Sequence, residues 1–263
     1  MSNAFKAIPL HPAASLPFVK PKTLLSVSSD SKTVKGEKAG YLTGILYLAP
    51  GTIAGTGNLC VNASTGCALS CLWQAGRAAM FESINRARVM KTRFLKNDRK
   101  GFESMLLKDV AALIRKAKRM GLTPALRLNG TSDLPFENLF PSVFSSFPTL
   151  QTYDYSKSIK RALAWSKGEM PSNYHLTFSL SESNRAQAAL ALRAGVNVAA
   201  VVHGYNPGET IPFEGLTVET VEGDSSDLRF LDRPSSNGQG RFIILKAKGP
   251  ARRDETGFVI RKG

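Results

Sequence analysis

The stretch GFESMLLKDVAALIRKAKRMGLTPALRLNGTSD, residues 101–133, changes its apolar period part-way along and thereby decides the fold. Its apolar residues first recur at steps of three and four, which predicts a helix of roughly four to five turns with one apolar stripe. Gly121 follows, where a glycine suits a left-handed helix cap. Residues 124–128 then have the pattern of a short strand. The stretch therefore predicts a helix-to-strand joint.

The same joint recurs farther along the chain. A helical pattern ends at Gly195 and an apolar run follows at residues 196–202, while 150–155 and 174–178 form two more apolar runs. The predicted strands end near Asn129, Asp154, Ser179 and His203, at steps of 25, 25 and 24 residues. Such regularity is typical of repeated βα units with right-handed crossovers. We therefore expect an α/β fold, a partial or distorted parallel (β/α) barrel.

The domain organisation follows from length and composition. The chain has 263 residues, and a βα barrel of this size fits in one domain. Residues 1–39 are rich in Pro, Ser and Lys, which indicates an N-terminal arm. The first buried strand is expected in YLTGILYL, residues 41–48, which Pro50 ends. We expect residues 40–263 to form the barrel domain.

Composition excludes several classes of protein. A hydrophobic content of 43% rules out wholesale disorder. No run approaches the roughly 18 apolar residues of a membrane-spanning helix, so we expect no membrane partner. The first 24 residues lack the layout of a secretory signal. Three cysteines within residues 60–71 are too few and too close together for a disulfide framework, which favours a reducing cytoplasm.

Basic residues are concentrated in one segment. The chain has 35 Lys and Arg against 20 Asp and Glu, a net charge of +15. Residues 77–119 hold 13 of the basic residues and 4 acidic ones, a local excess of +9. This density favours contacts with the phosphate backbone of a nucleic acid. The alternative is a pair of solvated helices.

Polar residues follow the predicted strands at their carboxyl ends, the face on which barrel proteins gather their chemistry. Any one of these residues could serve only in a turn, but together they predict a pocket for a charged ligand. The candidates are Asn129, Asp133, Asp154, Lys157, Ser179, Lys246 and Lys248.

The cysteines Cys60, Cys67 and Cys71 have the form C-x6-C-x3-C in a loop after the first predicted strand. Thiolates bind soft metals, and three from one loop can converge on one centre. A 4Fe-4S cluster held by three cysteines leaves one iron open for another ligand. Structural zinc would need a fourth ligand such as His175 or His203, and metal-free buried thiols are the third alternative. We favour the cluster.

Other candidates have simpler interpretations. His175 lies within an apolar strand pattern and is expected in the core, whereas His203, at a strand end, is open to either role. Asp224, Asp227 and Asp232 match no calcium loop and are expected in turns.

Several separate motifs lie at residues 60–77, 127–133, 153–157, 173–179 and 245–249. Together they resemble those of the phage gene product 88 family. The similarity covers roughly residues 40–260 and implies a phage-encoded protein that acts in the cytoplasm of an infected bacterial host. It further implies a barrel related to radical S-adenosylmethionine enzymes, with an iron-sulfur cluster on the three cysteines. The motifs are the cysteine loop with GR at 76–77, RLNGTSD at 127–133, YDYSK at 153–157, NYHLTFS at 173–179 and LKAKG at 245–249.

The chain departs from the radical enzymes in two places. Their cysteine spacing is C-x3-C-x2-C with an aromatic residue before the last cysteine, whereas here the spacing is longer and Ser70 has that position. Their Gly-Gly-Glu-like segment, which holds the amino group of S-adenosylmethionine, is replaced by NGT at 129–131. We therefore expect a 4Fe-4S protein whose open iron takes a small ligand, without cleavage of S-adenosylmethionine. The alternatives are an active radical enzyme and a nucleic-acid-binding protein with a structural or redox-sensing metal site.

Overall fold

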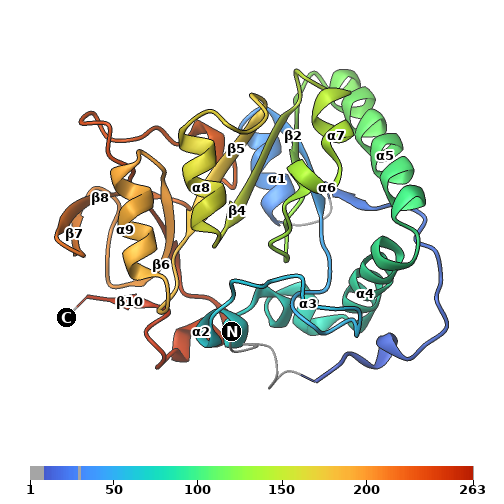
Figure 1. Ribbon diagram of the computed structural model, residues 1–263, viewed down its shortest axis with the longest axis horizontal. Coiled ribbons are helices and arrows are strands. Elements are labelled where there is room, and N and C mark those ends of the chain that lie inside the picture. The colour runs from blue at the N-terminus through green and yellow to red at the C-terminus, as the bar shows by residue number, and fades with distance from the viewer. Residues whose placement is uncertain (1–8, 29–30, 263) are drawn as a thin grey trace.

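The computed structural model describes residues 9–28 and 31–262, and β-branched and aromatic runs in this part form a mostly parallel sheet (Figure 1). The sheet has ten strands in the order β1-β2-β3-β4-β5-β6-β9-β8-β7, with β10 paired to β6. The strands are β1 Leu25–Val27, β2 Tyr41–Leu46, β3 Thr123–Arg127, β4 Gln151–Ser156, β5 Tyr174–Ser179, β6 Val198–His203, β7 Thr210–Phe213, β8 Leu216–Glu222, β9 Phe242–Lys246 and β10 Ile260–Arg261.

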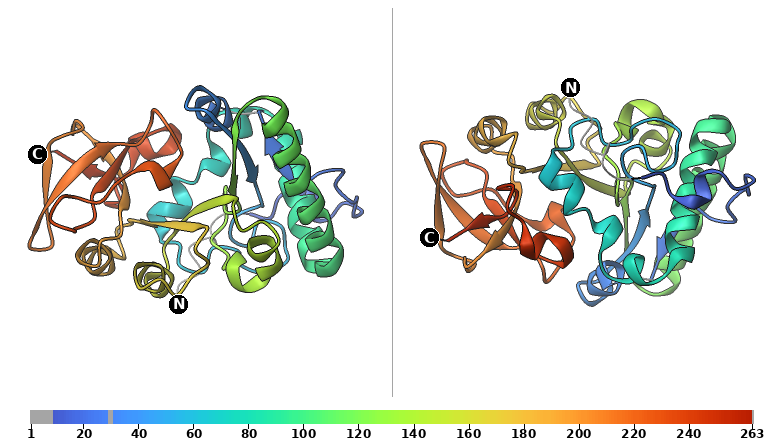
Figure 2. Two further views of the ribbon diagram at one scale, coloured as in Figure 1. Left: turned by 90° about the horizontal axis from the view of Figure 1, so that it is seen from above. Right: turned by 90° about the horizontal axis from the view of Figure 1, so that it is seen from below.

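Helices connect the parallel strands. The α-helices are α1 Ser31–Lys38, α2 Thr65–Leu69, α3 Arg77–Met80, α4 Glu82–Asn97, α5 Arg99–Arg119, α6 Phe136–Leu139, α7 Pro141–Ser145, α8 Ile159–Ser166 and α9 Arg185–Arg193. Short 3-10 helices are η1 Pro12–Ala14, η2 Leu72–Gln74, η3 Arg229–Leu231 and η4 Gly249–Arg253. In Figure 2, α5, α8 and α9 lie along the outer side of the curved sheet.

The joint between α5 and β3 forms as the sequence predicts. The apolar stripe of α5 is buried, and the helix ends before Gly121, whose φ of 65° is one that a side chain rarely adopts. On the sheet side, a Cβ on Gly44 would lie 2.8 Å from Leu113 Cδ2. The glycine therefore lets α5 pack closely on β2.

The strand repeat is also confirmed. β2 to β6 pair in chain order, and every one of these pairs is parallel. α8 connects β4 to β5, and α9 connects β5 to β6. Leu126, Leu176 and Phe178 are fully buried in the same apolar core as the stripe of α5. The parallel strands consequently bring their carboxyl ends to one edge.

Barrel closure is not established. The strand path has two ends, β1 and β7, and no strand pairing joins them in the described part of the chain. What the structure confirms is a mixed α/β fold with a mostly parallel sheet of ten strands.

Several elements were not predicted. β7 and β8 form an antiparallel hairpin, and β8 then pairs in parallel with β9. β10 pairs with the last two residues of β6. Within the predicted arm, β1 pairs with β2 and α1 packs on β2, so part of residues 1–39 belongs to the sheet layer. Residues 1–8 and 29–30 of that arm lie outside the described residues.

Among the described helices, none combines the length and apolar character needed to cross a membrane.

Candidate functional site

A cavity of about 950 Å³ lies at the carboxyl ends of the parallel strands. Cavities of this size hold small organic molecules. The predicted pocket residues meet there although they are far apart in the sequence. Those that line the cavity are Cys60, Cys67, Cys71, Asn129, Asp133, Lys157, Ser179, Lys246 and Lys248. Asp154 is fully buried and accepts a hydrogen bond from Asn129.

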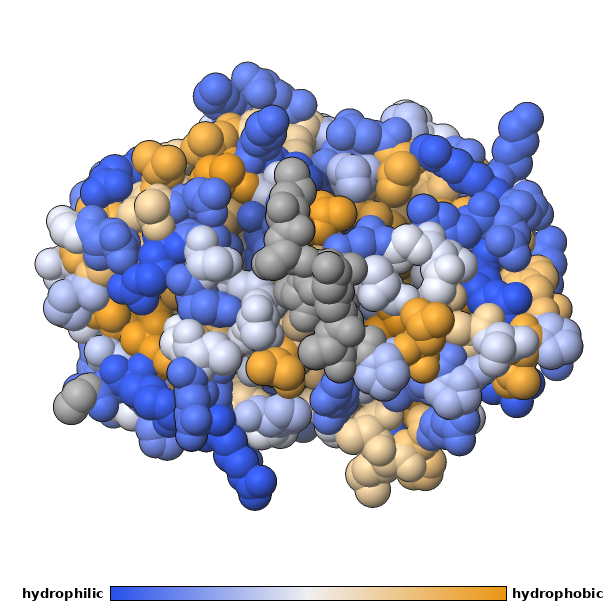
Figure 3. Space-filling model, turned by 60° about the horizontal axis from the view of Figure 1, so that its bottom comes forward, coloured by the Kyte–Doolittle hydropathy of each residue, from blue (hydrophilic) through white to orange (hydrophobic). Residues whose placement is uncertain are grey.

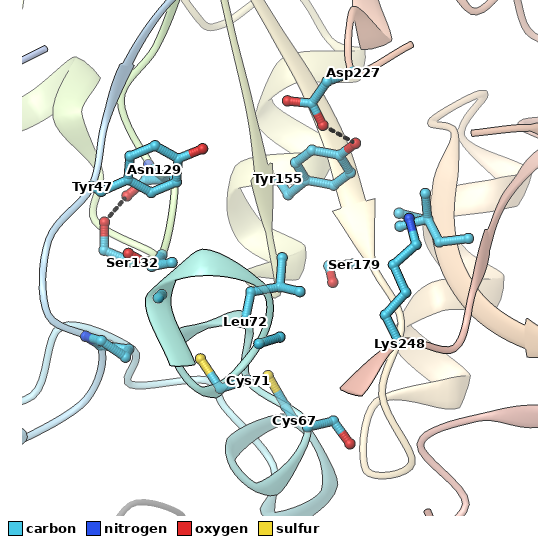
Figure 4. A pocket seen from close by; sticks show the side chains of 18 of the residues that line it. Tyr47, Cys67, Cys71, Leu72, Asn129, Ser132, Tyr155, Ser179, Asp227 and Lys248 are labelled. Atoms are coloured by element: carbon cyan, nitrogen blue, oxygen red, sulfur yellow. Dashed lines mark hydrogen bonds between the residues drawn. The ribbon is translucent and has the colours of Figure 1, made fainter. Parts of the chain in front are cut away.

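The cysteines come from three parts of one irregular loop. Cys60 follows a turn in which Leu59 N donates to Gly51 O at 3.0 Å, Cys67 is on α2, and Cys71 precedes η2. All three residues are partly buried. Figure 4 shows the side chains of Cys67 and Cys71 pointing into the cavity, with Asn129 on one side and Lys248 on the other.

Glu182 anchors the part of the loop that carries Cys67. Its carboxylate accepts hydrogen bonds from Ser64 Oγ and from Gly66 N, both at 2.7 Å. Ser64 Oγ in turn accepts from Cys67 N at 3.1 Å and caps α2. Hydrogen bonds to a carboxylate are stronger than neutral ones, so Glu182 contributes strongly to the position of α2.

The C-terminal segment covers the same loop. A Cβ on Gly66 would lie 2.2 Å from Thr256 Oγ1 and 2.7 Å from Phe258 Cβ, so only glycine fits there without displacement. Phe258 also lines the cavity, and β10 follows it along β6. Residues 254–261 therefore form one wall beside the cysteines.

The environment of the thiols keeps two of them protonated in the absence of a metal. Burial raises the pKa of Cys60 well above its ordinary value, and it raises the pKa of Cys71 to about 12. The charge of Cys67 raises the pKa of both thiols further, whereas Arg88 and Lys157 lower that of Cys71. The three sulfurs thus interact electrostatically, and two cations lie near Cys71.

The thiols do not form a site for a single metal ion. Among the described residues, no group of three or more His, Cys, Asp or Glu is arranged to hold one ion. A tetrahedral zinc site requires sulfurs about 3.8 Å apart, given zinc–sulfur bonds of about 2.3 Å. In a cubane cluster each cysteine binds a different iron, so its sulfurs lie farther apart than two ligands of one ion. The choice between a cluster and structural zinc therefore stays a prediction.

Neither histidine that was considered as a fourth zinc ligand belongs to the cavity lining. His175 packs its ring against Trp165 at 4.8 Å between centroids, and burial lowers its pKa to about 4. Its Nε2 has no hydrogen-bond partner within the described part of the structure. His203 is exposed at the end of β6. His175 is therefore a partly buried strand residue packed against Trp165, so the core prediction is confirmed only in part.

A network of buried hydrogen bonds around Asp154 supports Asn129, which lines the cavity. Asp154 Oδ1 accepts from Asn129 N at 2.6 Å, and Asp154 Oδ2 accepts from Asn129 Nδ2 at 3.1 Å and from Tyr174 Oη at 3.2 Å. Ser132 Oγ donates to Asn129 Oδ1 at 2.9 Å, as Figure 4 shows. Burial raises the pKa of Asp154 to about 7 even though Asn129 donates to it. This carboxylate therefore holds Asn129 and is one layer removed from the cavity.

Asp133 belongs to a second network with Arg161. Arg161 Nε and Nη2 donate to the two oxygens of Glu137 at 2.8 and 2.9 Å, and Nη1 donates to Asp133 at 3.0 Å. Asp133 also accepts from Ser156 Oγ at 2.7 Å and from Lys157 N at 2.9 Å. Asp133 therefore fixes the backbone at the end of β4, and Lys157 is left to reach Ser179 Oγ at 2.6 Å.

A third group, which includes residues assigned to turns, lies on the wall formed by β3 and β4. Arg127 Nη1 donates to Asp227 at 2.6 Å, and the Arg127 guanidinium lies 4.5 Å from the ring centre of Tyr155. Tyr155 Oη donates to Asp227 at 3.4 Å (Figure 4). Burial opposes the charge of Arg127, but Asp227 together with three neighbouring tyrosines keeps the pKa of Arg127 above its ordinary value. Asp227 is thus an ion-pair partner.

The other two aspartates that were expected only in turns also form ion pairs. Asp224 pairs with Lys248, and it accepts from Lys246 N at 2.8 Å. Asp232 pairs with Arg229 at 3.1 Å, while burial raises the pKa of Asp232 to about 6. Arg127 is the residue from which an ion pair could have been predicted, because a charged residue within an otherwise apolar strand requires a buried partner.

The fold places the basic residues of segment 77–119 in different surroundings. Arg77, Arg88 and Lys91 line the cavity, and burial lowers the pKa of Lys91 to about 8. Arg93 donates to backbone oxygens of the N-terminal residues Ala13 and Leu16. On the outer surface of α5, three other basic residues line a shallow depression: Arg115, Lys118 and Arg119. Nucleic-acid binding by this segment stays a prediction.

The outer side of the cysteine loop carries exposed apolar side chains. They are Val61, Leu69, Leu72, Met80 and Phe81. On the face shown in Figure 3, hydrophobic residues form separate patches among hydrophilic ones. Leu72 also lines the cavity, so apolar surface lies at its edge.

Comparison with known proteins supports the resemblance that the motifs suggested. The model of the gene product 88 family matches residues 23–262. The chain belongs to the gene product 88 family. Comparison with curated proteins and with solved structures gives no match.

Proposed function

We propose that this gene product 88 protein binds a 4Fe-4S cluster through Cys60, Cys67 and Cys71, with the fourth iron open to a small ligand in the cavity. The observation that carries the proposal is the meeting of three thiols at one cavity, beside strand ends that supply polar groups. Soft thiolate ligands select iron-sulfur clusters, and polar neighbours tune them.

The surroundings of the thiols support an anionic centre. Arg88 and Lys157 lower the pKa of Cys71, so their positive charges lie where thiolates would form. Cys60 Sγ lies 3.9 Å from Thr131 O, and Thr131 Oγ1 donates to Leu48 O at 2.5 Å, which joins the loop after β3 to the end of β2. The cluster would supply redox and Lewis-acid chemistry when bound. The protein's residues hold its ligands and enclose the adjacent space.

The open, mostly parallel sheet is consistent with a partial barrel of the radical S-adenosylmethionine type. We assign no cleavage of S-adenosylmethionine to it, because the cysteine spacing and the NGT segment at 129–131 differ from those enzymes. A reducing compartment, the cytoplasm of an infected bacterial host, suits three cysteines that form no disulfide with one another.

Anaerobic reconstitution tests the cluster. We expect about four irons and four acid-labile sulfides per chain, with visible absorption that each of Cys60→Ala, Cys67→Ala and Cys71→Ala abolishes. Ser70→Ala is a matched control, because Ser70 lines the same cavity without a thiol. Since two thiols are protonated without metal, cluster uptake should rise with pH. Oxygen-protected protein with neither iron nor sulfide would refute the proposal.

A second experiment tests whether the protein cleaves S-adenosylmethionine. Reduced, reconstituted protein is incubated with S-adenosylmethionine, and 5′-deoxyadenosine is measured against the Cys71→Ala variant. We expect equal amounts in both. Release above the variant would establish the active radical enzyme instead.

A further inference from the structure

The charge of the cavity lining exceeds what the cluster needs. Eight lysine and arginine residues line the cavity against three aspartates, so the formal excess is 8 minus 3, or +5. An oxidised cubane with three thiolates carries one negative charge. About four positive charges therefore remain along one cavity lining, and a cleft lined by one sign of charge attracts counter-ions. Such an excess favours an anionic ligand.

The cations fall into two groups. Arg88 and Lys157 affect the Cys71 thiol and thus belong to the cysteine side. Lys35 and Lys248 instead contact Asp224 through their side chains, and Lys246, which also lines the cavity, contacts it through its backbone N. Lys248 Nζ pairs with the Asp224 carboxylate, Lys246 N donates to it at 2.8 Å, and Lys35 Nζ donates to Asp224 O. We call these three residues the Asp224 lysines.

The Asp224 lysines match one kind of anion in charge. Three lysines and one aspartate leave a local excess of two positive charges. A phosphate monoester carries about −1.5 to −2 at neutral pH and three acceptor oxygens, whereas a single carboxylate carries half of that charge or little more. Burial opposes ionisation of Asp224, but Lys248 and Lys246 N lower its pKa, so the aspartate stays charged and holds Lys248.

An aromatic ring lies close to this group. Tyr155 lines the cavity and bonds to Asp227, three residues from Asp224 in the same loop. One side of its ring carries the Arg127 guanidinium at 4.5 Å. An aromatic ring of this kind can stack with a planar group, as tyrosines do with nucleic-acid bases.

We propose that the cavity binds a small phosphorylated molecule whose phosphate is held by Lys35, Lys246 and Lys248, next to the ligand-binding iron of the cluster. The inference rests on the proposed function for the position of that iron, but the phosphate contacts depend on the lysines alone. S-Adenosylmethionine does not suit this site, because its sulfonium and amino groups outweigh its carboxylate and give it a net positive charge.

Calorimetric titration of the full chain tests the inference in the metal-free and the reconstituted state. The probes are adenosine monophosphate, ribose 5-phosphate, adenosine and S-adenosylmethionine. We expect both phosphates to bind at least tenfold more tightly than the other two probes. A Lys35→Ala, Lys248→Ala double variant should lose at least tenfold in phosphate affinity, while Lys248→Arg should retain most of it. Lys118→Ala, on the outer surface of α5, is the matched control.

The outcomes separate the two proposals. Phosphate binding that disappears in the double variant supports the inference, and a stronger response to adenosine monophosphate than to ribose 5-phosphate identifies a nucleotide as its source. Equal affinities show that the site recognises the shared ribose phosphate and not the base. Reconstituted protein with full iron and sulfide that binds neither phosphate overturns the inference alone. Phosphate binding by protein that takes up neither iron nor sulfide on reconstitution overturns only the proposed function.

Discussion

The strand repeat at residues 123–203 and the cysteine loop at residues 51–76 border the same cavity but are stabilised differently. In the repeat, backbone pairing and a continuous apolar core fix every strand, and buried carboxylates have arginine or hydroxyl partners. The loop has two short helices, α2 and η2, and shares a small apolar cluster with η1 and α4. Its position depends on contacts with residues distant in sequence, above all Glu182, Thr256 and Phe258.

The strand repeat is thus the scaffold of the cavity, and the cysteine loop is the segment that we propose binds a metal centre. The repeat should keep its structure with or without a ligand, because its strands are paired on both sides and pack in the main apolar core. The loop carries partly buried thiols that are protonated without metal, so a bound centre adds free energy where the protein's own contacts are few. Substitutions in the two regions should consequently change different properties.

The largest effect is expected in the repeat. Arg161→Met leaves the carboxylates of Glu137 and Asp133 buried without their cation, which should cost about 3–5 kcal/mol of unfolding free energy. Arg185→Met is the matched control, since Arg185 pairs with Glu214 at the surface and the change should stay within about 1 kcal/mol. Urea unfolding measures both. Equal losses would show that the buried network does not stabilise the scaffold.

A smaller effect depends on pH. Burial raises the folded-state pKa of Asp154 to about 7, so between about pH 4 and 7 the folded protein keeps a proton that the unfolded chain has released. Stability should fall as pH rises through this window, by up to about 1.4 kcal/mol per pH unit. Asp154→Asn removes this contribution. The unfolding free energies of the unmodified protein and of Asp154→Asn should converge or cross as pH rises. Parallel pH profiles would contradict a raised pKa of Asp154.

The smallest effect is expected in the loop. Glu182→Ala removes two hydrogen bonds to a carboxylate and should cost about 1–2 kcal/mol, and Ser64→Ala removes a helix cap worth about 1 kcal/mol. Since Ser64 donates to Glu182, the double variant should lose less than the sum, with a coupling of about 1 kcal/mol.

Hydrogen exchange locates that loop effect. We expect faster exchange at residues 60–71 in Glu182→Ala and unchanged exchange at residues 123–203. Glu255→Ala, an exposed position, is the control. Faster exchange throughout the repeat would show that the loop and the scaffold unfold as one unit, which would remove the distinction between the two regions.

The sequence predicted the repeat because local patterns determine it. The stripe of α5, Gly121 and the following strand are each recognisable within one short segment, and so are β4, β5 and β6. The strand ends then follow from topology, since parallel strands present their carboxyl ends at one edge. This is why Asn129, Lys157 and Ser179 could be placed in one pocket from their positions alone.

Long-range pairings could not be predicted in the same way. Glu182 lies at a strand end like other polar residues, and only folding shows that its carboxylate reaches Ser64. The two aspartates 224 and 227 have the local signature of turns, yet each meets a cation from a distant strand or its extension. β10 joins the sheet beside β6, which is not its neighbour in sequence, so apolar periodicity carries no information about this partner.

The wall formed by residues 254–261 sets an order of assembly. During synthesis the cysteines leave the ribosome long before Thr256 and Phe258, which later close against Gly66. Until those residues arrive, a centre bound to the loop would face water and oxygen on that side. Residues 254–261 can therefore shield this side of the loop only once β10 has docked along β6. A metal centre that binds after this docking would be covered by the wall.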